Sequence, residues 1–233
     1  MSGSNRGKAL DATQRMRVAY LLTLAGGMMD AYTYVVRGGV FANAQTGNIV
    51  KLGIAFANGA RDQYLVFLLP IIAFSAGVLV ALMIEDYLNR RGLRLVRRSV
   101  LLMEVAGLAV VWAIPVGPEW NWGANCVVSF VAALQFEAFR TFRGEALATT
   151  MSTGNLRKFV ESLFLGVIHV DRSQLVSAAK YCSIIATFVL GAYLGTVSCD
   201  KLGPAAVAPA MASLALAVVI ITILRRSNVR EAG

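Results

Sequence analysis

Two polar segments of similar sequence interrupt otherwise apolar stretches of the chain. They are Ala44–Lys51 and Met151–Lys158, and both contain Thr-Gly-Asn, at an offset of 107 residues. Glycine permits the backbone to unwind or to approach a neighbour closely, and threonine and asparagine can cap a helix that begins there. Such a helix would direct free N–H groups and its positive end at an anion or a polar solute. The segments are therefore candidate binding elements, and the alternative is a capped, re-entrant helix without a ligand. The candidate residues in and beside them are Asn43, Gln45, Thr46, Gly47, Asn48, Thr150, Thr153, Gly154 and Asn155.

An acidic side chain precedes each segment at the same spacing. Asp30 lies 16 residues before the first Thr-Gly-Asn and Glu137 lies 16 residues before the second, each within an apolar stretch. A charge at the bilayer centre costs at least about 2.5–3.5 kcal/mol, so such residues face a cavity or a partner. The pattern indicates a cation or proton site, or gating by protonation. The alternative is that each carboxylate accepts backbone hydrogen bonds in the broken segment and holds the fold. Gln135 and Arg140 flank Glu137 loosely on one helix face and complete the candidate set.

Basic side chains follow each motif and would add positive charge to the same sites. They are Lys51 in the first segment and Arg157 and Lys158 in the second. Other chemistry has little support, since the sequence has no Ser/His/Asp set, no metal-ligand spacing and no Gly-rich nucleotide motif. The three cysteines lack CxxC spacing and are expected to pack as small residues. We therefore predict no enzyme activity, no cofactor and no metal.

The elements that position these residues are predicted from composition and hydropathy. Hydrophobic residues make up 57% of the chain, charged residues 15%, and mean hydropathy is +0.64, whereas a soluble domain is about 25% charged. The apolar stretches approach the roughly 20 residues that a membrane-spanning helix needs. The expected helices are 17–37, 64–86, 99–116, 124–142, 174–198 and 204–224. We predict an all-α membrane protein in a lipid bilayer. The basic residues lie at helix ends, so no nucleic-acid partner is expected.

An internal duplication organises these helices. The offset of 107 aligns Asp30-Ala-Tyr with Glu137-Ala-Phe, and beyond the motif an offset of 114 aligns Phe74 with Phe188. Collinear matches of this kind indicate a repeat. We predict a single transmembrane domain, 17–224, made of repeats at about 17–116 and 124–224. Short tails, 1–16 and 225–233, flank it.

The distribution of arginine and lysine predicts the topology. The loop Arg90–Arg98 contains five arginines, and both tails are basic, so all three are expected in the cytoplasm. The Thr-Gly-Asn segments then make no net crossing, which gives six full transmembrane helices, two broken or re-entrant segments and inverted repeats. The rival is eight full spans with parallel repeats, which Arg37, Lys51 and Arg61 favour weakly.

At the two motifs the sequence resembles the YoaK-type bacterial integral membrane proteins. The similarity rests on Asp30-Ala-Tyr and Gly38–Asn48 in the first half, and on Gln135, Phe142-Arg-Gly and Ala148–Asn155 in the second. It extends over about 15–225. The resemblance implies a small protein of the bacterial inner membrane, in a family without an assigned function, whose members often carry an amide in place of the second acid.

The leading hypothesis for function is a transporter or channel for a small polar solute or ion. It would work through the paired Thr-Gly-Asn segments and the intramembrane acids, with a homodimer as a candidate assembly. A non-transporting scaffold or stress-related membrane protein is the second hypothesis, and a membrane-embedded enzyme is a distant third.

Overall fold

The protein is almost entirely helical. The computed structural model describes residues 2–91, 96–139, 141–142, 145–146 and 152–230. Their elements are α1 (Ser2–Val35), α2 (Gln45–Ala57), α3 (Arg61–Arg90), α4 (Val96–Ala113), α5 (Pro118–Ala138), β1 (Thr141–Phe142), β2 (Glu145–Ala146), α6 (Ser152–Ile168), α7 (Arg172–Leu202), the 3-10 helix η1 (Gly203–Val207) and α8 (Ala208–Arg230). The predicted all-α fold is confirmed, apart from a hairpin of two-residue strands that sequence reasoning missed.

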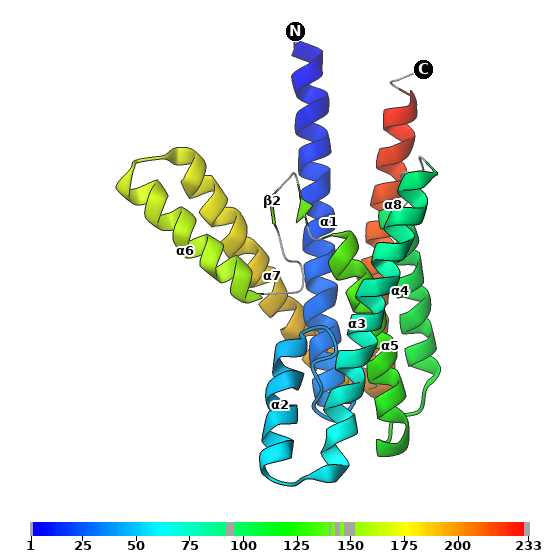
Figure 1. Ribbon diagram of the computed structural model, residues 1–233. Coiled ribbons are helices and arrows are strands. Elements are labelled where there is room, and N and C mark those ends of the chain that lie inside the picture. Colours follow the sequence, from blue (N-terminus) through cyan, green and yellow to red (C-terminus); the bar gives the residue numbers. More distant parts are fainter. Residues whose placement is uncertain (1, 92–95, 140, 143–144, 147–151, 231–233) are drawn as a thin grey trace.

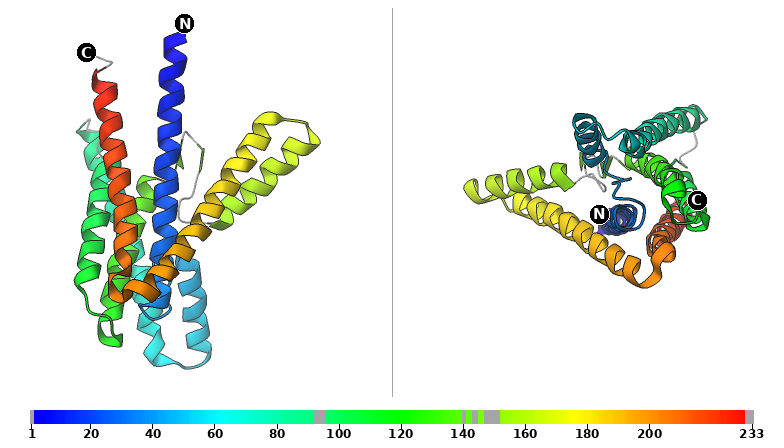
Figure 2. Two further views of the ribbon diagram at one scale, coloured as in Figure 1. Left: turned by 180° about the vertical axis from the view of Figure 1, so that it is seen from behind. Right: turned by 90° about the horizontal axis from the view of Figure 1, so that it is seen from below.

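Five long helices form a bundle, which the later part of α7 joins, and α6 and the start of α7 form an arm that extends from it (Figures 1 and 2). Helix α1 packs on α7 and α8, while α5 packs on α3 and α4; α4 and α8 join the two groups. The core contains Leu22, Leu108, Val128 and Leu214, from four different helices, and each is fully buried. The start of α1, the end of α8 and the end of α3 lie at the same end of the bundle (Figure 1).

Glycines allow the closest helix contacts. A Cβ atom at Gly195 of α7 would lie 2.8 Å from the Met28 Cα atom of α1, and one at Gly191 would overlap the Leu24 carbonyl. In the other group, a Cβ atom at Gly77 of α3 would lie 2.7 Å from that of Ala133 on α5. Neither contact leaves room for a larger residue, so small side chains set the spacing of both helix pairs.

The two Thr-Gly-Asn segments begin the two shortest α-helices in the described part of the chain. Helix α2 has 13 residues and α6 has 17, so they are about 20 and 26 Å long, short of the roughly 30 Å of a hydrocarbon core. Both begin part-way along the bundle, and α2 packs on α3 while α6 packs on α7 (Figure 1). Each of these two short helices thus packs on one long neighbouring helix.

Length and composition identify two segments that could cross a membrane. They are Arg61–Leu88, in which an 18-residue window has mean hydropathy 2.7, and Arg172–Ile223, in which such a window has mean hydropathy 2.4. The second segment includes α7, η1 and most of α8. An apolar, helical chain is therefore established. The number of crossings and the relation between the repeats stay predictions.

Candidate functional site

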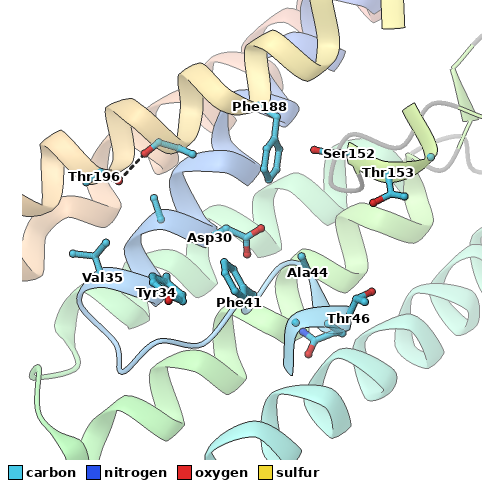
Figure 3. A pocket seen from close by; sticks show the side chains of 15 residues that line it. Asp30, Tyr34, Val35, Phe41, Ala44, Thr46, Ser152, Thr153, Phe188 and Thr196 are labelled. Atoms are coloured by element: carbon cyan, nitrogen blue, oxygen red, sulfur yellow. Dashed lines mark hydrogen bonds between the residues drawn. The ribbon is translucent and has the colours of Figure 1, made fainter. Parts of the chain in front are cut away.

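The two Thr-Gly-Asn segments meet at one pocket of about 530 Å³ (Figure 3). Thr46 and Gly47 line it from the first turn of α2, Thr153 and Gly154 line it from the first turn of α6, and Asp30 lines it from α1. Helix α7 closes another side with Phe188, Ala192 and Thr196. Residues that are 107 positions apart in the sequence thus share one cavity.

Asp30 connects the pocket to the chain that enters α2. Its side chain is only 5% exposed. Its Oδ1 atom accepts a hydrogen bond from the Asn43 backbone N–H at 3.0 Å, and the Ala44 backbone N–H donates a second bond to the carboxyl group. Asp30 therefore accepts backbone hydrogen bonds and holds the segment before α2, which is the structural role that the sequence analysis gave as an alternative. Its carboxyl group also faces the pocket.

The first motif does not cap its helix in the way the sequence suggested. The N-cap residue is Ala44, without a side-chain cap, so Thr46, Gly47 and Asn48 lie in the first turn rather than ahead of it. Asn48 is fully buried. Its side chain makes hydrogen bonds with both the N–H and the carbonyl group of Phe41. The Phe41 N–H donates to Asn48 Oδ1 at 3.1 Å, and Asn48 Nδ2 donates to the Phe41 carbonyl at 2.8 Å.

The Phe41 ring packs directly against Gly47. A Cβ atom at Gly47 would lie 2.6 Å from Cδ2 of Phe41, closer than real Cβ contacts. The Phe41 ring forms part of the pocket wall and stacks on Tyr34, with ring centroids 4.8 Å apart. Sequence reasoning missed both aromatic residues, although Phe41 lies within the Gly38–Asn48 signature.

Lys51 is not among the described residues that line the pocket. Its ammonium group donates a hydrogen bond to the Gly39 carbonyl. It lies 4.5 Å from the Tyr34 ring centroid, 5.0 Å from that of Phe41 and 5.7 Å from that of Phe67. We call Lys51 with these three rings the aromatic cluster. Lys51 lies on the second turn of α2, over rings that line the pocket, and its addition of positive charge to the start of α2 stays a prediction.

Two further candidate residues of the first half are Gln45 and Asn43. Gln45 lines it, and its Nε2 donates to the Ala42 carbonyl at 2.8 Å and to Ser129 Oγ of α5 at 3.3 Å. Asn43 is 1% exposed, and its Oδ1 atom has no hydrogen-bond partner among the described residues. Gln45 therefore ties the start of α2 to α5.

The second half contributes fewer of the predicted residues. Asn155 is 3% exposed on α6. Gln135 and Glu137 are not among the described residues that line the pocket. Arg140 and Thr150 lie outside the described residues. Among the described residues, the pocket therefore has one acid in its wall, Asp30, and not a symmetrical pair.

Gln135 instead meets a second buried acid. With its amide nitrogen toward α4, it donates to the Glu104 oxygen atoms at 3.0 and 3.2 Å. Both side chains are fully buried. The structure pairs Glu104 with the amide of the neighbouring helix.

The chain belongs to the family described as "Protein of unknown function (DUF1275)", whose model matches residues 18–221. The match includes Asp30, both Thr-Gly-Asn segments and the whole pocket. No curated protein and no solved structure matches the chain. The expected membership of a family of unknown function is confirmed, and the narrower YoaK-type resemblance stays a prediction.

Proposed function

We propose that this protein is a multi-pass carrier of the bacterial inner membrane, and that it binds a small solute in the pocket beside Asp30. The observation that carries the proposal is the meeting of two Thr-Gly-Asn segments at one cavity. Its volume of about 530 Å³ lies in the range of small-molecule sites, roughly 300–1,000 Å³. Half-length helices that begin at a shared site are a recurring feature of membrane carriers.

Apolar side chains on the outside of the protein support its place in a bilayer. Leu79, Met83, Val189 and Ile223 are each at least 60% exposed, and they belong to the two segments that could cross a membrane. Proteins that face water rarely expose extended apolar surfaces. Lipid is the simplest cover for them.

The basic ends support six crossings with the termini in the cytoplasm. The start of α1, the end of α8 and the end of α3, where Arg90 is followed by Arg91, lie at one end of the bundle (Figure 1). Exposed Trp120 and Trp122 belong to the start of α5 at the other end. Arginine marks the cytoplasmic side, and tryptophan favours an interface.

Two of the residues that favoured eight spans have local partners. Arg37 is fully buried, and its guanidinium group donates to the carbonyl oxygens of Val111 at 3.0 Å and Ile114 at 2.8 Å, at the end of α4. Lys51 is held in the aromatic cluster. A cation that satisfies the last carbonyls of a helix has a structural reason for its position, so it is weak evidence about the side of the membrane.

The helix contacts support inverted repeats. Helices α1 and α5 begin at opposite ends of the bundle (Figure 1). The packing of α1 on α7 and α8 corresponds to that of α5 on α3 and α4. Gly191 and Gly77, which the offset of 114 aligns, both lie in these close contacts. A carrier built from such repeats would expose its site alternately to the two sides.

Site-directed labelling tests the proposal. In a variant without native cysteines, Thr46→Cys and Thr153→Cys each place a thiol in the pocket wall, and Val170→Cys places a control thiol on an exposed turn. We expect a solute from a panel of cations, anions and neutral molecules to slow maleimide labelling at both pocket positions and not at the control. The same solute should enter proteoliposomes, and Thr46→Val should reduce that flux.

Failure of every solute in both assays would contradict the carrier and favour the scaffold hypothesis. Topology is tested separately by labelling cysteines placed in 59–62 and in 89–92. Six crossings require these loops on opposite sides of the membrane. The homodimer stays a prediction, which the mass of the purified particle would test.

A further inference from the structure

The walls of the pocket carry a single type of formal charge. Asp30 is an acid, and none of the described lining residues is lysine, arginine or histidine. The nearest candidate cation on α2, Lys51, is bound to the Gly39 carbonyl and lies over the rings of the aromatic cluster. The charged wall of the site would therefore attract a positive group and repel a negative one.

Three aromatic rings from three parts of the chain line the same pocket as the acid. Tyr34 comes from α1, Phe41 from the connection to α2 and Phe188 from α7. Figure 3 shows the Asp30 carboxyl group between Phe188 and Phe41. The faces of such rings attract ammonium groups, and aromatic pockets with a carboxylate bind alkylated ammonium ligands well. In this protein, Lys51 already makes that contact with Tyr34 and Phe41 from outside the pocket.

The size of the pocket argues against a bare inorganic ion. A dehydrated calcium ion requires six to eight oxygen ligands at about 2.3–2.6 Å. The pocket is about 530 Å³ in volume, and the described residues contain no group of three His, Cys, Asp or Glu side chains that could hold a metal. Ala31, Ala44 and Ala192 add apolar wall. An organic ligand with apolar groups would fill this space better.

The start of α6 presents the opposing argument. Its first turn lines the pocket, and a helix N-terminus favours an anion. At α2 the same preference is already met, because the Asp30 carboxyl group accepts the backbone N–H groups that lead into the helix. A full charge in the wall outweighs the remaining partial charge of one helix end.

We propose that the pocket selects a compact organic monocation, an ammonium group carrying alkyl substituents, with Asp30 as its counter-ion and Tyr34, Phe41 and Phe188 around it. This inference rests on the proposed function, since it assigns the class of solute for the same site.

Three probes of nearly equal shape test the charge preference. They are choline, its neutral analogue 3,3-dimethyl-1-butanol and the anion 3,3-dimethylbutanoate. Each is measured by its protection of Thr153→Cys from maleimide in the full chain, without native cysteines, in lipid nanodiscs. We expect choline to protect at a concentration at least about tenfold lower than the neutral alcohol, and the anion to give no protection.

Two pocket variants and one control assign the preference to named groups. Asp30→Asn keeps an oxygen acceptor for the Asn43 N–H and removes the charge, so choline should lose at least about tenfold in apparent affinity while the alcohol is unchanged. Phe188→Leu removes one ring. Phe188 makes none of the side-chain hydrogen bonds that hold α2, so this variant should weaken the binding of choline alone. Asp86→Asn changes an exposed acid that pairs with Arg90 at 2.9 Å, and it should have no effect.

Each other outcome overturns the inference in a distinct way. Equal protection by choline and the alcohol would show a neutral site, and strongest protection by the anion would show that the start of α6 dominates; the carrier would stand in both cases. If Asp30→Asn does not fold, Phe188→Leu decides, and an unchanged preference for choline there contradicts the aromatic part. Protection by members of the wider panel but by none of these three also rejects the proposed class. No protection by any solute rejects the carrier itself.

Discussion

The two Thr-Gly-Asn segments share three residues and a pocket, but their surroundings differ. In the first, Gly47 lies against the Phe41 ring and Asn48 holds the Phe41 backbone through two hydrogen bonds. In the second, a Cβ atom at Gly154 would have no described heavy atom within 4 Å. The same motif therefore has a tightly packed copy and an open copy. Sequence identity between repeats predicts a shared location better than a shared set of contacts.

The tight copy should depend most strongly on Asn48. Asn48→Ala would remove the partners of the Phe41 N–H and carbonyl groups, and each buried polar group left without a partner costs about 1–3 kcal/mol. We expect about 3 kcal/mol of destabilisation, measured as a fall in thermal midpoint in detergent. Asn58→Ala changes an exposed residue at the end of the same helix and should have little effect. An equal fall in both variants would show that the clamp does not stabilise the first segment.

Gly47 and Gly154 give the most direct comparison of the two copies. Gly47→Ala would place a methyl group 2.6 Å from the Phe41 ring, and overpacking of this kind costs about 1–3 kcal/mol. Gly154→Ala should be neutral or slightly stabilising, because alanine favours a helix by about 1 kcal/mol over glycine. Thermal midpoints of the two variants would measure the difference. Equal losses at the two positions would remove the distinction between a packed and an open motif.

Replacing the basic residue after each motif should also destabilise the first copy more than the second, with smaller losses of stability than at the glycines. Lys51 contacts three rings and the Gly39 carbonyl, whereas its counterpart Lys158 pairs with Glu161 at 3.1 Å, and both side chains of that pair are 44% exposed. Lys51→Met should cost about 1 kcal/mol, and Lys158→Met at most a few tenths, about the value of an exposed helix pair. Chemical denaturation would compare them. A larger loss at Lys158 would show that the second copy is the better anchored one.

The helices and the location of the site could be predicted from the sequence, because hydropathy and self-similarity depend on the order of residues alone. Asp30 and both motifs were identified in this way. The contacts of the site could not be predicted, since they depend on which face of a helix meets its neighbour. Phe188 reaches the pocket from α7, Lys51 lies over the rings of the aromatic cluster, and Gln135 turns toward Glu104. None of these directions has a signal in residue spacing.

The turns that follow the two half-length helices extend the comparison to backbone geometry. The turn after α2 has Gly59 at φ 66°, and the turn after α6 has Val170 at φ 52°. A β-branched residue in this left-handed region costs about 1–2 kcal/mol, and Val170 is 87% exposed, so packing offers little compensation. Val170→Gly should therefore stabilise the protein by about 1 kcal/mol or less, since glycine also gains freedom in the unfolded chain.

Gly59→Val is the reciprocal variant, and it should destabilise the turn after α2 by a similar amount. Both would be measured as thermal midpoints at neutral pH. Hydrogen bonds from the Ser173 side chain and backbone hold the pKa of Asp171 below its ordinary value, so this cap of α7 is charged under these conditions in every variant. If Val170→Gly lowers the midpoint, the valine makes a contact that outweighs its backbone strain. A contact between Val170 and a surface that covers it in the membrane would then explain why the turn after α6 has valine at a positive φ where the turn after α2 has glycine.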